Sequence, residues 1–348
     1  MIYWSADWHL TRYTWNQKRE LDGDSYKALD SVVDLILSQP KEGKTLIIAG
    51  DIFNGCKADG MTLDAFTNAI DRLHEQNIKV LFIQGNHDRN VIPIPAVQGC
   101  VHIHKKLVNI DGYKIYGLDW LPREQLHEEL KQIPECDILV MHSAFQHLFG
   151  FADAYDLTLE DIPGHVRNIV TGHIHVADIT KFRGEGSCVS PGPTHPCNIT
   201  ESDTKGIYST SPGSAPIFAF NPIPSRPILR LTLSGEAAVG SVSSQLNELK
   251  GNEYRPLVEI KYPLALREQV TALVAKHSDK VFFLEASRFG KLNLKEGERM
   301  TYERATLESS LPHLVNPETD TELYNFLHGM LTGNPREVID RKLADEKA

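Results

Sequence analysis

The sequence contains no apolar run as long as the roughly 18 residues that a membrane-spanning helix needs. Its first residues, MIYWSADWHL, lack the basic segment and following apolar segment of a secretory signal. The five cysteines are scattered and form no Cys-x-x-Cys pair, which argues against a disulfide framework and against a cysteine zinc site. We therefore expect a cytoplasmic protein without membrane attachment, in which most cysteines are reduced and structural.

The charge balance of the chain argues against a protein that binds nucleic acid without a partner. It carries 36 Lys and Arg against 46 Asp and Glu, a formal net charge of -10. A protein that binds nucleic acid alone usually shows a basic patch or a high pI. Such a role would need bound metal cations or a basic partner to supply the missing positive charge.

The pattern of the first half predicts a layered α/β fold. Short apolar, β-branched runs alternate with segments of helical period that start near Ser25 and Thr62, which we interpret as N-caps. Buried strands are typically continuous apolar runs, so this alternation favours an α/β core. The length of 348 residues suggests two domains, or one large domain with an appendage.

Polar residues that can bind metal follow five of these apolar runs. MIYWSA leads to DWH, TLIIAG to DIFN, KVLFIQG to NHD, DILVMH to SAF, and NIVTGH to IH. In α/β sheets, ligands collect at the carboxyl ends of the strands. One such residue after a strand could occur by chance, but five indicate a shared site. We therefore expect these side chains to converge on one edge of the sheet.

The residue types at these strand ends indicate an open catalytic metal site. Asp7 and His9 are one residue apart, so on an extended strand they would point the same way and could share one ion. His173 and His175 have the same spacing but follow a glycine turn, so their imidazoles can face different ions. Oxygen and imidazole ligands without thiolate are typical of manganese, iron, zinc or magnesium in an open catalytic site. They are less typical of a closed structural zinc site.

The second half of the chain has a different pattern. From about Asp178, short strand candidates are separated by Gly, Pro and Ser, which predicts a second sheet packed against the first. A small α/β unit follows, from RPLVEIKYP through LREQVTALVAKHS to VFFLEASR. We predict a core over residues 1–235, a small α/β domain over 254–315 and a C-terminal helical segment over 318–348.

The motifs, taken in order, resemble a known signature. Asp7-x-His9, Gly50-Asp51-x-x-Asn54, Gly85-Asn86-His87-Asp88, His142 and Gly172-His173-x-His175 resemble the calcineurin-like metallophosphoesterases. ADWHL, GDIFN, QGNHDRN and the later VSPGPTHPCNITESDTKGIY are similar to SbcD-type DNA repair nuclease subunits, the meiotic recombination nuclease family. This resemblance implies an αββα sandwich with a small α/β capping, DNA-binding domain and a C-terminal helical extension that docks on a partner.

The resemblance also implies a two-metal site. One ion would be held by Asp7, His9, Asp51 and His175. The second would be held by Asp51, Asn86, His142 and His173, with Asp51 bridging. Mn²⁺ is the expected metal, with Mg²⁺, Fe²⁺ and Zn²⁺ as alternatives. His87 would protonate the leaving group or stabilise its charge, and Asp88 would orient His87. We interpret Asn54 as a turn cap, and His147 and His195 as loop residues.

The function implied by the resemblance is a manganese-dependent DNA nuclease. It would be an exonuclease on duplex ends and an endonuclease on single strands, in double-strand break processing and recombination. Its partners would be DNA and an SbcC-type coiled-coil ATPase, with a homodimer inside a heterotetramer. Two alternatives stay open. A stand-alone cyclic-nucleotide or small-molecule phosphodiesterase would need neither the unit after Glu253 nor the C-terminal helix, and a noncatalytic scaffold would not need the complete ligand set.

Two further segments are candidate binding surfaces. The loop LTRYTWNQKREL contains Arg12, Tyr13, Trp15, Lys18 and Arg19. These residues suit base stacking and phosphate pairing, or equally a solvated loop with an aromatic anchor. Near the C-terminus, one helical stripe contains Leu323, Phe326, Leu327, Met330 and Leu331. This stripe is either a partner-docking surface or part of the core.

Overall fold

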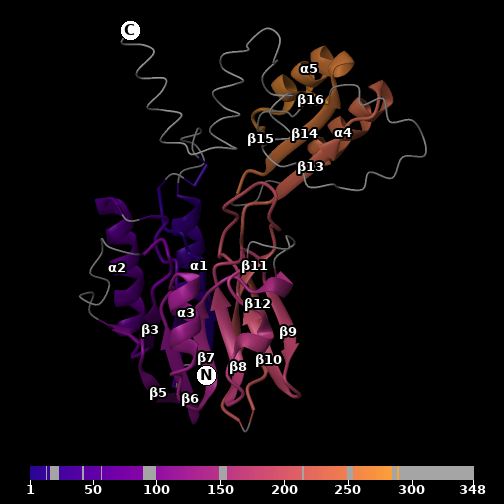
Figure 1. Cartoon of the computed structure of the whole chain (residues 1–348). Helices are drawn as coiled ribbons and strands as arrows, with labels where there is room; N and C mark the ends of the chain where they lie inside the picture. Colours follow the sequence, from indigo (N-terminus) through magenta and orange to yellow (C-terminus); the bar gives the residue numbers. More distant parts are fainter. Residues whose placement is uncertain are drawn as a thin grey trace, which may run out of the picture. The chain divides into compact units, whose positions relative to one another are not determined.

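The computed structural model describes residues 1–12, 14–15, 23–40, 43–55, 57–88, 99–148, 155–213, 215–248, 254–283 and 288–289 (Figure 1). Two sets of predicted residues lie outside this described part: Tyr13, Lys18 and Arg19 of the basic loop, and Leu323, Phe326, Leu327, Met330 and Leu331 of the C-terminal stripe. None of the helices in the described part is long and apolar enough to cross a membrane.

Two mixed sheets form the centre of the fold. The first has the order β12 (Phe218–Ile223), β11 (Lys205–Thr210), β1 (Ile2–Ser5), β2 (Thr45–Ala49), β3 (Lys79–Ile83) and β4 (Cys100–His102). The second has the order β5 (Leu107–Ile110), β6 (Tyr113–Leu118), β7 (Cys136–His142), β8 (Val166–Gly172), β10 (Gly186–Ser190) and β9 (Asp178–Phe182). Strands β1 to β4 are mutually parallel, and so are β6, β7, β8 and β10.

Helices cover the outer faces of both sheets. Helices α1 (Asp24–Ser38) and α2 (Gly60–His74) lie side by side, and α3 (Arg123–Leu130) follows β6 (Figure 1). Short 3-10 helices span Gln146–Leu148 and Leu159–Asp161. Alternate residues of β2 show the layering, because Leu46 and Ile48 pack with α1 and α2 while Ile47 packs with Val140 of the second sheet. Leu139 on the opposite face of β7 packs with Leu126 of α3. The predicted αββα sandwich is confirmed.

The strands of the second half are divided between the two sheets. β9 and β10 extend the second sheet, whereas β11 pairs antiparallel with β1 of the first sheet and β12 pairs with β11. The prediction that the strand candidates from about Asp178 form one second sheet was therefore wrong for β11 and β12, which join the first sheet. Apolar strands such as KGIYST match either sheet locally, so only long-range pairing decides where each strand joins.

Both helix starts also differ from the prediction. Helix α1 begins at Asp24 after Gly23 in the left-handed conformation, and the Ser25 hydroxyl donates instead to the carbonyl oxygen of Thr11 at 2.7 Å. Helix α2 is capped by Asp59, whose carboxylate accepts from the Thr62 amide at 2.8 Å. Ser25 and Thr62 are thus inside the first turns: the Ser25 hydroxyl is used by the Thr11 backbone, and the Asp59 carboxylate caps α2 in place of Thr62.

After the sandwich, the chain forms a third, smaller sheet with its own helices. It contains β13 (Ile228–Thr232), β14 (Leu257–Pro263), β15 (Phe282–Phe283) and β16 (Arg288–Phe289), with α4 (Glu236–Glu248), α5 (Arg267–His277) and a 3-10 turn at Leu264–Leu266. Because β13 pairs in parallel with β14, we propose that the small domain begins at β13, a few residues before the predicted boundary at 235.

A buried ion pair ties the segment before β13 to helix α1. The Arg226 guanidinium donates to both carboxylate oxygens of Asp24 at 2.6 Å, and these side chains are only 4% and 2% exposed. The same guanidinium lies over the rings of Tyr254 and Phe282. Arg226 therefore contacts both helix α1, through Asp24, and the small domain, through Tyr254 and Phe282.

Arg226→Ala is expected to lower the free energy of unfolding by about 3 to 5 kcal/mol, because it leaves the buried Asp24 carboxylate without its counter-ion. The matched control is Arg72→Ala, which removes two ion pairs on the surface, with Asp30 and Asp34, at an arginine that is 39% exposed. That loss should stay below about 1 kcal/mol. Urea unfolding of both variants measures the difference, and equal losses would contradict the assigned role of the Arg226 pair.

Candidate metal centre

Five loops meet where the two sheets bring their strand ends together. Strands β1, β2 and β3 end just before Asp7, Asp51 and Asn86, while β7 ends at His142 and β8 just before His173. The His142 Nδ1–H donates to the carbonyl oxygen of Ala49 at 2.8 Å, which joins the two edges directly. The predicted convergence is therefore present, although two sheets contribute to it, not one.

The backbone around the expected ligands is strained. Asp7, His9, Asp51 and His173 have φ of 51°, 40°, 51° and 93°. This left-handed region costs non-glycine residues on the order of 1 to 3 kcal/mol each and is concentrated at functional sites. Asp7 and His9 thus lie on a strained loop after β1, and not on the extended strand that the sequence analysis assumed. Their amides donate to the carbonyl oxygens of Gly50 and Asp51 at 3.0 Å, which holds the loop in place.

Two glycines leave space for this packing. A Cβ on Gly85 would lie 2.0 Å from Oδ1 of Asp51, and one on Gly50 would lie 2.5 Å from Nδ1 of His142. Gly50 also has φ of 87°. Any side chain at either position would displace an expected ligand, so the prediction of a close backbone approach at Gly50 is consistent with the structure.

The first group of ligands faces one position from several sides. Nε2 of His9 lies 3.0 Å from Nε2 of His175 and 3.6 Å from Oδ2 of Asp51. Asp7 is fully buried, and its Oδ1 accepts from the His173 amide at 2.9 Å. Its Oδ2 has no hydrogen-bond partner within the described part of the chain. A buried carboxylate oxygen without a partner is costly unless a cation compensates it, so these residues fit a divalent ion.

The second group is built around the same carboxylate. Oδ2 of Asp51 lies 3.3 Å from Nε2 of His142, and Nδ1 of His173 lies 3.0 Å from Oδ1 of Asn86. One ligand atom from each of Asp51, His142 and His173 lies within 4.8 Å of the others. Because the Ala49 carbonyl only accepts, His142 carries its proton on Nδ1 and directs Nε2 toward Asp51. Oδ2 of Asp51 therefore lies between the two groups.

Burial sets the protonation of most of these side chains. It lowers the pKa of His9 to about 3 and that of His173 to about 4, so both imidazoles are neutral at pH 7 and offer lone pairs. Burial also raises the pKa of Asp7 to about 6. Burial lowers the pKa of His142 too, but the Asp51 carboxylate outweighs it and raises the value to about 9. A cation bound at His142 would have to displace that proton.

The family follows from a match over half of the sequence. Residues 2–177 match the calcineurin-like phosphoesterase family, and this range contains every residue of the two ligand groups. The chain belongs to the calcineurin-like phosphoesterases. The predicted enzyme class is confirmed by this membership.

Three archaeal relatives of this phosphoesterase are named DNA double-strand break repair protein Mre11. The protein of Nanoarchaeum equitans is 26% identical over 275 residues, which cover 67% of this chain and 71% of the relative. The protein of Thermoplasma acidophilum is 23% identical, and the match covers 76% of this chain and 77% of the relative. The protein of Sulfolobus acidocaldarius is 21% identical, and the match covers 89% of this chain and 87% of the relative. These similarities confirm the resemblance to the SbcD-type family.

The His87 and Asp88 side chains of this phosphoesterase have different partners from those predicted. Nδ1 of His87 donates to the carbonyl oxygen of Asn54 at 3.0 Å. The Asp88 carboxylate accepts from the amides of Ile52, Phe53 and Gly85 at 3.0 to 3.2 Å. The prediction that the Asp88 side chain orients His87 was wrong. The Asp88 carboxylate binds backbone amides of the loops, and the Asn54 carbonyl oxygen orients the His87 imidazole.

Glu201 is a site residue of the phosphoesterase that sequence reasoning missed. Nδ1–H of His175 donates to its Oε1 at 2.8 Å, which directs Nε2 of His175 toward Nε2 of His9 at the proposed ion position. Its Oε2 accepts from Nζ of Lys205 at 2.8 Å and from the Cys197 amide at 3.1 Å. Burial raises the pKa of Glu201, but the His175 hydrogen bond and the Lys205 charge outweigh it and lower the value to about 2. Glu201 lies in the segment VSPGPTHPCNITESDTKGIY that supported the family resemblance, but nothing in that segment indicates its hydrogen bond to His175.

Glu201→Ala is expected to weaken binding of the ion at His175 by about 10- to 100-fold, because the imidazole loses the carboxylate that fixes its orientation and tautomer. Titration of the metal-free phosphoesterase with Mn²⁺ measures this. Glu128→Ala removes a glutamate that is 70% exposed and should leave the affinity unchanged. Equal affinity in the Glu201 variant and the native protein would contradict the role of Glu201.

The basic aromatic loop is described at Arg12 and Trp15. The indole Nε1 of Trp15 donates to Oδ2 of Asp24 at 3.0 Å, and the ring packs against Ile228, Leu257 and Phe282. These contacts favour the interpretation of Trp15 as an aromatic anchor over base stacking.

Proposed function

We propose that this phosphoesterase is a two-metal DNA nuclease that acts in double-strand break processing and recombination. The observation that carries the proposal is the position of Oδ2 of Asp51, 3.6 Å from Nε2 of His9 and 3.3 Å from Nε2 of His142. A carboxylate between two sets of oxygen and imidazole ligands suits a pair of divalent cations. The Mre11 relatives support DNA as the substrate, because they match up to 89% of the chain.

The proposed ligands are those that the resemblance implies. Asp7, His9, Asp51 and His175 would hold one ion, and Asp51, Asn86, His142 and His173 the other. Mn²⁺ is the expected metal, with Mg²⁺, Fe²⁺ and Zn²⁺ as alternatives. When bound, the two ions would polarise the phosphodiester, activate a water and stabilise the leaving oxygen.

His87 is the proposed acid. Its ring lies 4.9 Å from the His9 ring at 90°, beside the proposed metal position and partly exposed. Since the Asn54 carbonyl holds the proton on Nδ1, Nε2 is the atom available to the substrate. Protonated His87 would donate from Nε2 to the leaving oxygen of the cleaved strand. Asp88 would support this step indirectly, because its carboxylate accepts from the amides of Ile52 and Gly85 and so holds these two loops together at the site.

The substrate class can be tested by comparing DNA with a generic phosphodiester. We expect the Mn²⁺-loaded protein to cleave duplex ends as an exonuclease and single strands as an endonuclease. The value of kcat/KM on DNA should exceed that on bis(p-nitrophenyl) phosphate by at least about a hundredfold, because contacts distant from the scissile bond add transition-state binding. Equal values on both substrates would favour the alternative, a small-molecule phosphodiesterase.

We further propose that the enzyme acts in the cytoplasm with an SbcC-type coiled-coil ATPase, as a homodimer inside a heterotetramer. The net charge of -10 supports a partner that shares DNA binding. The proposed docking surface is the C-terminal stripe that begins at Leu323, which lies outside the described residues. A contiguous apolar stripe must be covered by its own chain or by another.

Deletion of residues from Asp320 onward is expected to abolish ATP-stimulated cleavage of duplex ends while sparing metal binding and cleavage of short single strands. The reason is that the deletion removes the apolar stripe but none of the proposed ligands. Co-purification with the ATPase and nuclease assays with and without ATP measure both effects. Loss of basal activity or of folding would show that the stripe belongs to the core.

A further inference from the structure

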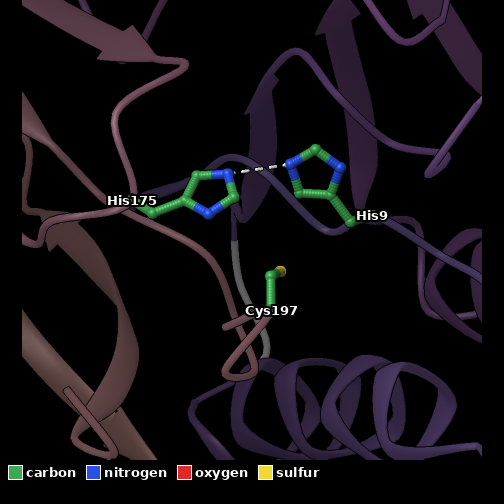
Figure 2. Close-up of side chains that lie close together, drawn as sticks. All are labelled: His9, His175 and Cys197. Carbon is green, nitrogen blue, oxygen red and sulfur yellow. Dashed lines mark hydrogen bonds between the residues drawn. The ribbon is translucent and has the colours of Figure 1, made fainter. Parts of the chain in front are cut away.

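Cys197 places a thiol beside the first metal position. One ligand atom from each of His9, His175 and Cys197 lies within 4.8 Å of the others. Figure 2 shows the two imidazoles facing each other and the Cys197 sulfur beside the gap between them. The three residues come from separate loops, after β1, after β8 and after β10. Only the fold brings this thiol to the two imidazoles.

The surroundings hold the thiol in that place. Glu201 accepts from Nδ1–H of His175 through Oε1 and from the Cys197 amide through Oε2, so one carboxylate positions both residues. Sγ of Cys197 also lies 3.7 Å from Nε2 of His195, whose side chain is only 2% exposed. His195, interpreted from the sequence as a loop residue, is therefore a buried neighbour of the thiol. A hydrogen bond to sulfur is a usual way to orient a thiolate ligand.

The two imidazoles provide independent support for a cation at this point. His9 is 4% exposed, and its Nε2 lies 3.0 Å from Nε2 of His175. His175 uses its Nδ1–H for Glu201, so its Nε2 faces the same gap. Asp7, two residues before His9, has a buried Oδ2 without a hydrogen-bond partner among the described residues. The thiol therefore borders the gap that the two imidazoles share, close in the chain to a buried carboxylate oxygen without a partner.

We propose that Cys197 is an additional ligand of the ion at His9 and His175, and that its thiolate gives this position a preference for Zn²⁺, Co²⁺ or Fe²⁺ over Mn²⁺ and Mg²⁺. Thiolate is a soft ligand that selects such metals, and it loses its proton on coordination. The second position, with Asp51, Asn86, His142 and His173, has oxygen and imidazole donors alone and suits Mn²⁺. The two positions thus differ in metal selectivity. The inference rests on the proposed metal site but not on DNA as the substrate.

The test uses the full chain after removal of metal by a chelator. Co²⁺ bound by a thiolate produces a charge-transfer band in the near ultraviolet. We expect this band in the native protein and in Cys100→Ser, the control at a partly buried cysteine in β4, but not in Cys197→Ser. Affinity for Zn²⁺ should fall by about 10- to 100-fold in Cys197→Ser, and affinity for Mn²⁺ by less than about threefold.

A band that persists in Cys197→Ser, or that is absent from cobalt-loaded native protein, would overturn the proposal. If Cys197→Ser does not fold, X-ray absorption of the zinc-loaded native protein decides instead. Sulfur at about 2.3 Å from zinc supports the proposal, and a shell of oxygen and nitrogen alone refutes it. These readouts are independent of catalysis. A protein that binds cobalt through sulfur but cleaves no DNA would contradict the proposed function and leave the ligand assignment intact.

Discussion

Asp51→Asn is expected to lose both metal ions and at least about a thousandfold of turnover. Oδ2 of Asp51 is the atom shared by the His9 and His142 groups, and an amide cannot supply charge to two cations at once. Each metal contributes several kcal/mol of transition-state stabilisation, and roughly 4 kcal/mol corresponds to a factor of about 10³ in rate. The loss should therefore be larger than for any residue that binds a single ion.

Metal analysis after gel filtration, together with a nuclease assay, measures this prediction. Asp34→Asn is the matched control, because Asp34 is 67% exposed on α1 and pairs only with Arg72 among the ion pairs of the described residues. It should keep both ions and full activity. Two occupied positions with near-native turnover in the Asp51 variant would rule out bridging.

His87→Ala is expected to lower turnover by roughly two to four orders of magnitude while both ions stay bound. This is the usual reach of a positioned acid or base. His87 donates through Nδ1 to the Asn54 carbonyl, so its Nε2 is oriented before substrate arrives. Its removal should affect kcat more than the concentration of metal needed for activity.

The geometry also allows a competing role for His87. One of its ring nitrogens lies within 4.8 Å of ligand atoms of His9 and Asp51, which is close enough to share an ion with them. Metal content separates the two roles. If the alanine variant loses an ion, His87 is a ligand and not the acid. Asn54→Ala keeps the backbone carbonyl and should leave both metal content and turnover close to those of the native protein.

The convergence of the candidate metal ligands could be predicted from the sequence because its signal is local. Each of Asp7, Asp51, Asn86 and His142 stands at the end of an apolar run, and parallel strands bring such ends to the same edge. The strained conformations of Asp7 and Asp51 were not predictable, because they depend on backbone hydrogen bonds between separate loops. The convergence of these side chains was thus predicted, whereas the extended backbone assumed for Asp7 and His9 was wrong.

Residues that act through distant partners had no signal of this kind. Glu201 lies 26 positions after His175, and its role depends on how its loop returns to the site, which the segment VSPGPTHPCNITESDTKGIY does not indicate. Cys197 was set aside because it belongs to no Cys-x-x-Cys pair. The Asn54 carbonyl that orients His87 is a backbone group and leaves no trace in the sequence. The pairing of β11 with β1 likewise depends on contacts across most of the domain.

The most direct test of the central claim is anomalous X-ray scattering from crystals of the Mn²⁺-loaded protein. We expect two peaks about 3.5 to 4 Å apart, with Asp51 between them. One peak should be coordinated by His9 and His175, and the other by His142 and His173. A single peak, or two peaks without Asp51 as a shared ligand, would contradict a two-metal site bridged by Asp51.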